Sequence, residues 1–484
     1  MIRPTGFAAI LTLSLAACAL AACGLAACGS ATANDGAGGS GGQGQGDGGS
    51  NASGGAAPSG GSSSGGSFGG EGGDASGGSA PQGPSTECGE TIEPSAVQIE
   101  ISPEDDLAEA LANAPAGATV LLADGTYDVG ADGLWVGADG VLVRAASGDR
   151  ASVILDGGYR QSSGGVLNVA GRSDVTLAHL TITHGRYHLV HVTGGPEGPS
   201  ARARLYDLEL VDPGEQAVKI NSNYDFDSDD GEVACSSLLL TDEGRSVVMQ
   251  NEAAGSFCYT GGIDAHRAQN WTVRDNVIEG FWCDGDLSEH GIHFWRGSRD
   301  TTIQRNLLID NARGIGLGLG QPGDGRTYDD APCGGQAAEH FGGTIENNMI
   351  VGRRAELFSS PSGMDLGVGL EAACEVLVVH NTVASTEAPF SSMEWRWPET
   401  SVSAVNNLVT HELRSRDGAS ADLVSNVTNA PLSTFVDIEA ADAHLASSSV
   451  ATLGAAEGAE LSPTDFDGDA RTATPHVGAD QAVD

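Results

Sequence analysis

Seven short segments of this chain carry imidazole, ammonium, carboxylate and guanidinium groups at matching positions. Aligned, the segments are LVHVT (189–193), AVKIN (217–221), GIDAH (262–266), GIHFW (291–295), GIGLG (314–318), GVGLE (367–371) and SMEWR (392–396). One position reads His191, Lys219, Asp264, His293, Gly316, Gly369 and Glu394, and the position two residues later reads Thr193, Asn221, His266, Trp295, Gly318, Glu371 and Arg396. Clusters of titratable groups are candidates for functional sites, and this one predicts a binding surface.

These residue types suit chemistry on an acidic polysaccharide. A β-eliminating lyase needs a base and a cation that neutralises the uronate carboxylate. Lys219, His266 or His293 can act as the base, and Arg267 or Arg296 as the neutralising cation. The expected substrate contacts come from the remaining polar and aromatic residues of the two positions: His191, Asn221, Asp264, Trp295, Glu394 and Arg396.

Hydrolysis is the alternative reaction, and it requires two carboxylates across the glycosidic bond. Asp264 and Glu394 fall on segments several repeats apart, whereas the loop acids Asp284, Asp286 and Glu289 can supply a second carboxylate. The choice between elimination and hydrolysis stays open at the level of the sequence.

An acidic loop, DFDSDDGE (225–232), is a candidate calcium site. Asp225, Asp227 and Asp229 alternate along it, as the oxygen ligands of calcium loops do, although its glycine falls one place late for an EF-hand. A polar turn is the competing interpretation. No other cofactor is predicted, and the absence of any Cys-x-x-Cys pair argues against a cysteine zinc site.

A second repeat indicates the fold that positions these residues. Six strand-like segments each end in asparagine: WTVRDN (271–276), TTIQRN (301–306), GTIENN (343–348), VLVVHN (376–381), VSAVNN (402–407) and ADLVSN (421–426). Stacked coils would place the asparagines about 4.8 Å apart, where their amides can bond to each other as a ladder. Asparagine also tolerates the left-handed backbone of a tight corner. Two earlier segments place His179 and Asp207 at the asparagine position.

Both ends of the repeat carry closing elements, as solenoids require. Ser102 is predicted as an N-cap and Pro103 as the first residue of a short helix that covers the first coil, followed by a strand over 118–127. At the other end, 465–471 and 475–481 form a closing segment. The spacing between repeats is irregular, which predicts loops of variable length on one side of a constant coil. The fold class is therefore all-β, a right-handed parallel β-helix with an N-terminal capping helix.

The N-terminus predicts export. Arg3 precedes an apolar stretch over 7–20, too short to span a bilayer, and Leu-Ala-Ala-Cys recurs up to Cys18, Cys23 and Cys28. This resembles the lipobox of bacterial lipoproteins, and Cys28 is the expected lipidated residue; an ordinary signal peptide is the alternative. A lipid anchor would hold the protein at the outer membrane or cell surface without a transmembrane helix.

Composition divides the chain into a signal segment (1–28), a Gly/Ser-rich tether (29–87) and the β-helix domain (88–484). The tether lacks the apolar residues needed to fold. Among the six later cysteines, Cys235–Cys258 and Cys283–Cys333 are the predicted disulfides. The net charge of −42 argues against nucleic-acid binding. The protein is expected to be a monomer.

The repeats, GATVLLADGTY (117–127) and the terminal DFDGDAR and HVGAD segments resemble the pectate-lyase-like superfamily of right-handed parallel β-helix proteins, and more closely exported β-helix lipoproteins of that type. The resemblance implies the fold over the whole region after the tether. It implies no residue roles, because the superfamily's Trp-Ile-Asp-His, Arg-x-Pro-x-x-Arg and Asn-Gly-x-Glu signatures are absent.

Together these observations favour a surface-anchored carbohydrate-active protein that binds an extracellular polysaccharide, with cleavage by elimination or hydrolysis as the further step. The competing hypothesis is a non-catalytic adhesin or structural surface protein that presents loops on a β-helix scaffold.

Overall fold

The computed structural model describes residues 88–248, 258–323, 325–448 and 452–482. The chain divides into two compact units, Met1–Asp74 and Ala75–Asp484, and all described residues belong to the second. The predicted signal segment, the lipidated Cys28 and the tether lie outside the described residues. No helix in the described part of the chain is long and apolar enough to cross a membrane.

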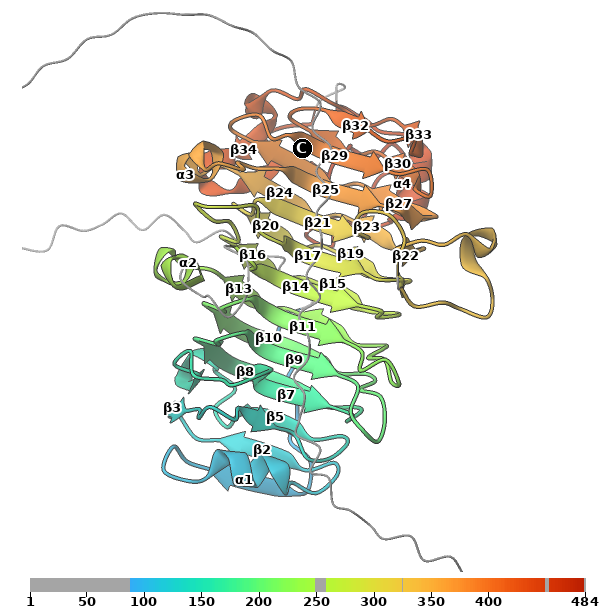
Figure 1. Ribbon diagram of the computed structural model, residues 1–484. Coiled ribbons are helices and arrows are strands. Elements are labelled where there is room, and N and C mark those ends of the chain that lie inside the picture. Colours follow the sequence, from blue (N-terminus) through green and yellow to red (C-terminus); the bar gives the residue numbers. More distant parts are fainter. Residues whose placement is uncertain (1–87, 249–257, 324, 449–451, 483–484) are drawn as a thin grey trace, which may run out of the picture. The chain divides into compact units, whose positions relative to one another are not determined.

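The described residues form a right-handed parallel β-helix, as the repeats predicted (Figure 1). One parallel sheet carries the chemistry-bearing segments and consists of β4 (Leu134–Trp135), β7 (Gly165–Ala170), β9 (His188–Thr193), β11 (Gln216–Asn221), β14 (Gly261–His266), β17 (His290–Trp295), β21 (Arg313–Leu317), β25 (Leu366–Glu371), β29 (Ser391–Arg396) and β32 (Leu413–Ser415). We call it the site sheet.

A larger parallel sheet forms the other walls of the coils. It consists of β1 (Gln98–Ile101), β2 (Thr119–Leu122), β3 (Gly125–Asp128), β5 (Leu142–Ala145), β6 (Val153–Asp156), β8 (Thr176–Thr183), β10 (Arg204–Val211), β12 (Glu232–Ala234), β13 (Ser237–Leu239), β15 (Thr272–Arg274), β16 (Val277–Glu279), β19 (Thr302–Gln304), β20 (Leu307–Ile309), β23 (Thr344–Glu346), β24 (Met349–Gly352), β27 (Val376–Val379), β28 (Thr382–Ser385), β30 (Ser401–Val405), β31 (Leu408–Val409) and β33 (Ser420–Val424). A typical coil runs through three strands, such as β14, β15 and β16. Three short strands in the turns, β18 (Ser298–Arg299), β22 (His340–Phe341) and β26 (Ala373–Cys374), form a small parallel sheet of their own.

The asparagine ladder exists and occupies the corner between the second and third strands of successive coils. The Asn306 side-chain amide donates to Asn348 Oδ1 at 2.9 Å, and the Asn348 amide donates to Asn381 Oδ1 at 2.9 Å. The same contact links Asn276 to Asn306 and continues to Asn407 and Asn426. The buried amides thus satisfy one another along the helix axis.

One detail of the ladder prediction was wrong. The left-handed backbone belongs to the residue before each ladder asparagine, as at Asp275 (φ 57°) and Asn347 (φ 53°). His179 and Asp207 also have positive φ, so they align with that residue and not with the asparagine. The register places Leu208 opposite Leu180 at the ladder position, because these earlier coils continue as one strand through the corner.

The N-terminal helix covers the first coil, but it begins later than predicted. Helix α1 (Leu107–Ala112) is capped by Asp106, whose carboxylate accepts from the Glu109 N–H at 2.9 Å. Ser102 instead donates its N–H and its hydroxyl to the Asp105 carboxylate at 2.8 and 2.7 Å. Ser102 and Asp105 thus close a turn that precedes the N-cap, and Ser102 is not itself the N-cap.

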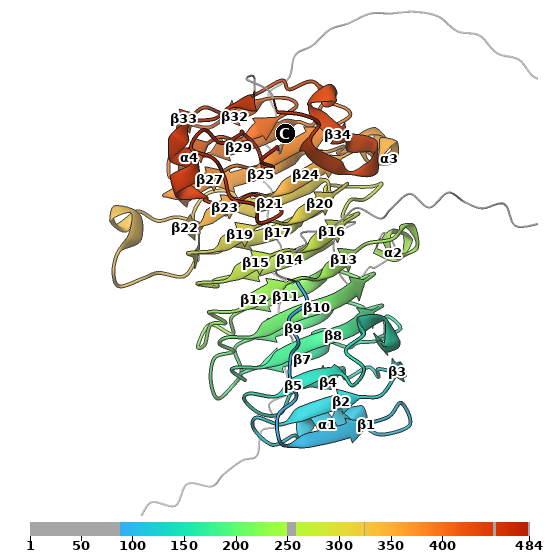
Figure 2. The same cartoon turned by 180° about the vertical axis from the view of Figure 1, so that it is seen from behind.

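The C-terminal segment covers the outer face of the last coils rather than their open end (Figure 2). It contains β34 (Phe435–Asp437), β35 (Asp442–Leu445) and α4 (Ala456–Leu461). Phe466 and Val477 join a buried cluster with the outward residues Ile309 and Val351. Arg471 is buried and donates to Asn347 Oδ1 at 2.7 Å. The predicted closing segment therefore packs against the outside of the β-helix.

All six later cysteines form disulfides, but the predicted pairing was wrong. The bonds are Cys88–Cys235, Cys258–Cys283 and Cys333–Cys374. The prediction paired neighbours in sequence within interrupting loops. In the β-helix, stacking instead brings cysteines from other coils close together. Cys235 therefore bonds to Cys88, the first described residue, and Cys333 bonds to Cys374, 41 residues later.

Candidate functional site

The strand register confirms the first of the two columns inferred from the sequence. Parallel strands about 4.8 Å apart place corresponding side chains directly above one another. In the site sheet Lys219 pairs with His191 on one side and with Asp264 on the other. The column continues through His293, Gly316, Gly369 and Glu394.

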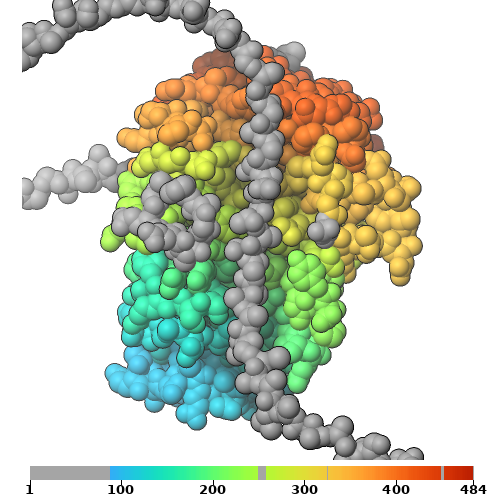
Figure 3. Space-filling view, in the orientation of Figure 1, coloured from blue at the N-terminus to red at the C-terminus, as the bar shows by residue number. Residues whose placement is uncertain are grey.

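Loops border this sheet on both sides (Figure 1). Helices α2 (Asp242–Val248) and α3 (Ala355–Ser359) lie on one side, and the gold loop between β21 and β22 lies on the other. The space-filling view shows that gold loop standing out from the coils (Figure 3). The variable loops thus flank the column on both sides, whereas the irregular repeat spacing predicted them on one side only.

A buried ion pair forms the centre of the site. The Lys219 ammonium contacts Asp264 Oδ2, and their side chains are only 6% and 2% exposed. Lys219 also donates to His266 Nε2 at 3.1 Å, and His266 Nε2 lies 3.3 Å from Asp264 Oδ2. Because an ammonium has only donors, His266 Nε2 must carry a lone pair. The imidazole is therefore neutral in this arrangement.

The electrostatics agree with a neutral imidazole. Burial, and then the nearby Lys219 charge, lower the pKa of His266 to about 4. Burial has the opposite effect on the acid Glu215, whose pKa rises to about 7 although Lys219 opposes the shift. Burial and the neighbouring carboxylates also raise the pKa of Tyr259. The site thus combines a neutral base with groups that resist ionisation.

Trp295 connects the centre to the next coil. Its indole N–H donates to Asp264 Oδ1 at 2.8 Å, and its ring meets His266 edge-on with centroids 4.6 Å apart. The His293 ring stacks parallel to it at 5.4 Å. Trp295 therefore holds Asp264 and both imidazoles in place; sugar stacking on this ring stays a prediction.

The two candidate arginines differ in their partners. Arg267 Nε lies 3.3 Å from Asp227 and is already neutralised. The Arg296 guanidinium lies over the Trp295 ring at 4.6 Å, and its buried Nε has no hydrogen-bond partner. Within the described residues, no carboxylate forms an ion pair with Arg296. This arginine is therefore the candidate anion-binding group.

The structure does not bring the three predicted calcium ligands together. Asp227 lies 3.2 Å from Arg326, in addition to its contact with Arg267, and Asp229 lies 2.7 Å from Arg326. Asp225 is exposed. Guanidinium groups thus neutralise two of the three carboxylates, and calcium binding by this loop stays a prediction.

The outer members of the predicted site pair with each other or with residues of the turns. At one end, His191 Nε2 and Asn221 Oδ1 are 3.1 Å apart. At the other end, Glu394 is buried and lies 3.0 Å from Arg416. Arg396 lies 2.8 Å from Asp417. His191 and Asn221 thus lie beside Lys219, on β9 and β11, whereas Glu394 and Arg396 share β29, four strand spacings from Asp264.

Sequence reasoning missed Glu215, Tyr259 and His290, and His290 is the most informative of the three. His290 begins β17, where strict alternation would direct it inward, yet its ring centroid is 4.2 Å from that of His293. Glu289 Oε2 lies 3.4 Å from His293 Nδ1 and 3.9 Å from His290 Nδ1. The signal that could have revealed this group is Glu-His-x-x-His at a strand start.

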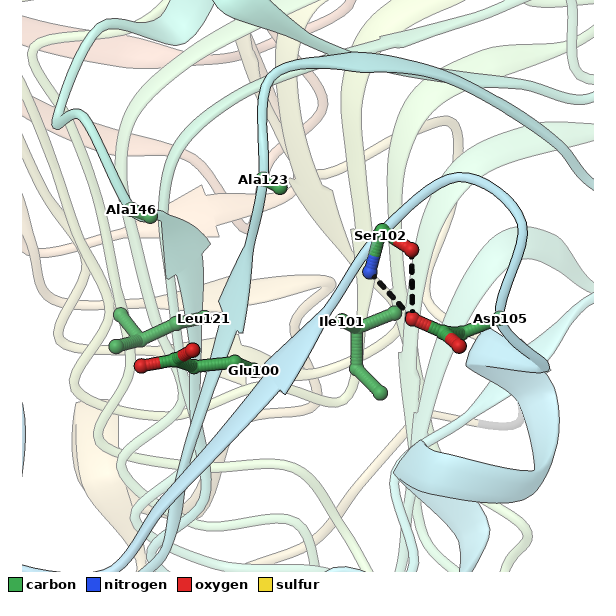
Figure 4. Close-up of a pocket in the computed structure, with 7 residues that line it drawn as sticks. All are labelled: Glu100, Ile101, Ser102, Asp105, Leu121, Ala123 and Ala146. Carbon is green, nitrogen blue, oxygen red and sulfur yellow. Dashed lines mark hydrogen bonds between the residues drawn. The ribbon is translucent and has the colours of Figure 1, made fainter.

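A separate hollow of about 330 Å³ lies at the N-terminal end, beside β1 and β2 (Figure 4). Ile101 and Leu121 contribute apolar walls, whereas Ser102 and Asp105 bond to each other there. It lies far along the β-helix from Lys219. The hollow is part of the cap and not of the candidate site.

No protein-family model matches the chain, and no curated protein matches it in sequence. Among solved structures, an alginate lyase from Paenibacillus sp. str. FPU-7 has 16% identity and a TM-score of 0.45, covering 68% of this chain and 100% of that one. Pectate lyase Pel9A has 14% identity and a TM-score of 0.45, covering 80% and 96%. The Streptococcus pneumoniae surface adhesin PfbA has 9% identity and a TM-score of 0.39, covering 66% and 84%. Values this low assign neither a family nor an activity.

Proposed function

We propose that this protein binds an acidic extracellular polysaccharide on the site sheet and cleaves it by β-elimination. Arg296 binds the uronate carboxylate, His266 removes the proton α to it, and Lys219 returns a proton to the leaving oxygen. The non-catalytic adhesin is the alternative that the experiment below distinguishes.

The observation that carries the proposal is the unpaired guanidinium of Arg296. The chain has 65 acidic residues against 23 basic ones, so an arginine has an abundance of carboxylates to pair with. Arg267 and Arg326, on neighbouring turns, both pair with aspartates. Arg296 has none among the described residues, although its Nε is buried. Arg296 is half-buried, and a guanidinium whose buried Nε has no partner can accept an anionic ligand; a planar carboxylate fits its fork.

The proton transfers balance between two adjacent groups. His266 takes the α-proton, and the electron pair of the broken C–H bond forms the double bond as the β-carbon–oxygen bond breaks. Lys219 protonates the departing oxygen. The proton on His266 then passes across the 3.1 Å contact to Lys219, which restores both groups. Asp264 contacts the Lys219 side chain and keeps it in position.

Hydrolysis by the predicted outward carboxylates is disfavoured by distance. Asp264 lies on β14 and Glu394 on β29, four strand spacings apart in the site sheet. At about 4.8 Å per strand this separation is about 19 Å. Glycosidases hold their two carboxyl groups about 5–9.5 Å apart, so this pair cannot act together.

The remaining expectations belong to the same proposal. A lipid on Cys28 would anchor the protein at the outer membrane or cell surface, and the tether would present a monomeric β-helix to the polysaccharide. Mass spectrometry of the N-terminal peptide from the native host tests the anchor, because a diacylglyceryl cysteine at position 28 has a distinct mass.

The test of activity is an incubation of the purified protein with uronate and neutral polysaccharides, followed by absorbance of unsaturated uronates and by reducing ends. New unsaturated ends from uronate polymers are expected. Arg296→Gln and His266→Gln should each lower the rate at least about 100-fold. Arg267→Gln is the matched control and should retain activity. Reducing ends without unsaturation would replace elimination by hydrolysis, and silence in both assays would favour the adhesin.

A further inference from the structure

Three side chains beside the catalytic centre form a second group that the proposed elimination does not use. Glu289 Oε2, His290 Nδ1 and His293 Nδ1 can all lie within 4.8 Å of one another. Each of these three atoms is buried and has no hydrogen-bond partner. Buried polar atoms are normally satisfied, so three converging exceptions require an explanation.

The hydrogen bond on the far side of His293 determines its tautomer. His293 Nε2 lies 3.1 Å from the Gly318 carbonyl oxygen, which can only accept a hydrogen bond. Nε2 therefore carries the proton, and in the neutral ring Nδ1 presents a lone pair. That lone pair faces Glu289 Oε2 at 3.4 Å and Asp264 Oδ1 at 3.9 Å. A positive charge between these atoms satisfies all of them, and it can be a proton on Nδ1 or a bound metal ion.

The separations suit a tetrahedral metal site. Zinc binds nitrogen and carboxylate oxygen at about 2.0–2.1 Å, which places neighbouring tetrahedral ligands about 3.3 Å apart. The measured separations from Glu289 Oε2 are 3.4 Å to His293 Nδ1 and 3.9 Å to His290 Nδ1. A ligating histidine usually donates its other N–H to a carbonyl or carboxylate, as His293 does.

The neighbouring coil is shaped to admit the second histidine. Gly316 pairs with His293 in the register, and a Cβ on Gly316 would lie 2.6 Å from His290 Nε2. The His290 ring thus occupies the space where the Gly316 side chain would be. At Gly369, one coil further on, a Cβ would meet only the flexible Leu366 side chain, at 2.9 Å. The glycine at 316 is therefore specific to the placement of His290.

We infer that Glu289, His290 and His293 bind one divalent transition-metal ion of the zinc class through Oε2, Nδ1 and Nδ1. Two imidazoles and a carboxylate select such a metal over calcium or magnesium. Three protein ligands leave a coordination position open toward Asp264. The cysteine argument against zinc does not apply, because this site uses no cysteine. The inference does not depend on the proposed elimination.

The test is metal binding, measured on the purified protein after treatment with a chelator. Titration with Zn²⁺ followed by calorimetry should show one equivalent bound, and Co²⁺ should give the visible absorbance of a tetrahedral nitrogen/oxygen site. His293→Ala and Glu289→Ala should each weaken Zn²⁺ binding by more than about 100-fold. Melting temperatures without metal report whether each variant folds.

Two matched variants separate the site from nonspecific binding. Gly316→Ala leaves all three ligands in the chain but displaces His290, and it should also weaken Zn²⁺ binding. Gly369→Ala and His191→Ala alter the same sheet elsewhere and should bind Zn²⁺ as the wild type does. No Zn²⁺ uptake by the wild type would overturn the inference, and so would full uptake by folded His293→Ala. Zinc binding without cleavage of any polysaccharide would uphold this inference and refute the proposed function.

Discussion

The buried Lys219–Asp264 pair offers a quantitative test of the site. Its side chains are 6% and 2% exposed, so water cannot compensate either charge when the other is removed. Breaking a buried pair typically costs about 3–5 kcal/mol, consistent with about 4 kcal/mol for unit charges about 4 Å apart at an effective dielectric constant of 20. We therefore expect Lys219→Met and Asp264→Asn each to lower the free energy of unfolding by about 3–5 kcal/mol.

The double variant shows whether the two charges stabilise the protein as a buried pair or independently of each other. In Lys219→Met/Asp264→Asn neither charge remains, and the asparagine can still accept from the Trp295 N–H. The double variant should therefore be more stable than either single variant, with a coupling energy of at least about 2 kcal/mol.

Urea unfolding followed by circular dichroism measures all four proteins. Asp174→Asn is the control, because its bidentate partner Arg202 is on the surface and the two side chains are 53% and 54% exposed. That change should cost under about 1 kcal/mol. Two results together would refute the claim that the pair is buried. The first is that each single variant loses no more free energy of unfolding than Asp174→Asn. The second is that the losses of the two single variants add up to the loss of the double variant.

Two further predictions concern the scaffold. Asn348→Ala removes five side-chain hydrogen bonds, four of them buried, and should lower the free energy of unfolding by about 3–5 kcal/mol in urea unfolding. Asn426→Ala, at the half-buried end of the ladder, removes three and should cost about half as much; equal costs would contradict a stabilising role that depends on burial within the ladder. Hydrogen bonds to Asp467, and secondarily to Asp442, raise the pKa of His444 to about 9. Its stabilising contribution should be complete below pH 6.5 and lost as the pH rises through about 9, so the melting temperatures of wild type and His444→Gln should converge above pH 9 and differ most below pH 6.5.

The repeats predicted the fold because a stacked coil repeats its physical requirements. Each ladder asparagine forms a side-chain hydrogen bond with the asparagine of the next coil, so the residue recurs in register from Asn276 to Asn426. The same logic gave the outward column, since alternation on a strand fixes which side chains share a face. Sequence therefore sufficed for the coil walls and for the placement of Lys219 beside Asp264.

The sequence could not give the features that depend on which coils approach each other at the turns. Disulfide partners are set by the path of the loops, so Cys88 and Cys235 meet across 147 residues. His290 departs from strand alternation because space over Gly316 admits its ring. The lack of an ion-pair partner for Arg296 among the described residues is also invisible in the sequence, since it depends on where every nearby acidic side chain lies.

The central claim is that Arg296 recognises the carboxylate of a uronate chain. It is tested most directly by comparing the affinity for a uronate oligosaccharide with that for the same oligosaccharide after its carboxyl groups have been reduced to alcohols. A charge-assisted pair contributes about 1.5–3 kcal/mol, so the wild type should bind the uronate form about 10–100-fold more tightly, and Arg296→Gln should bind both forms equally. Equal affinity of the wild type for the two forms would contradict the account.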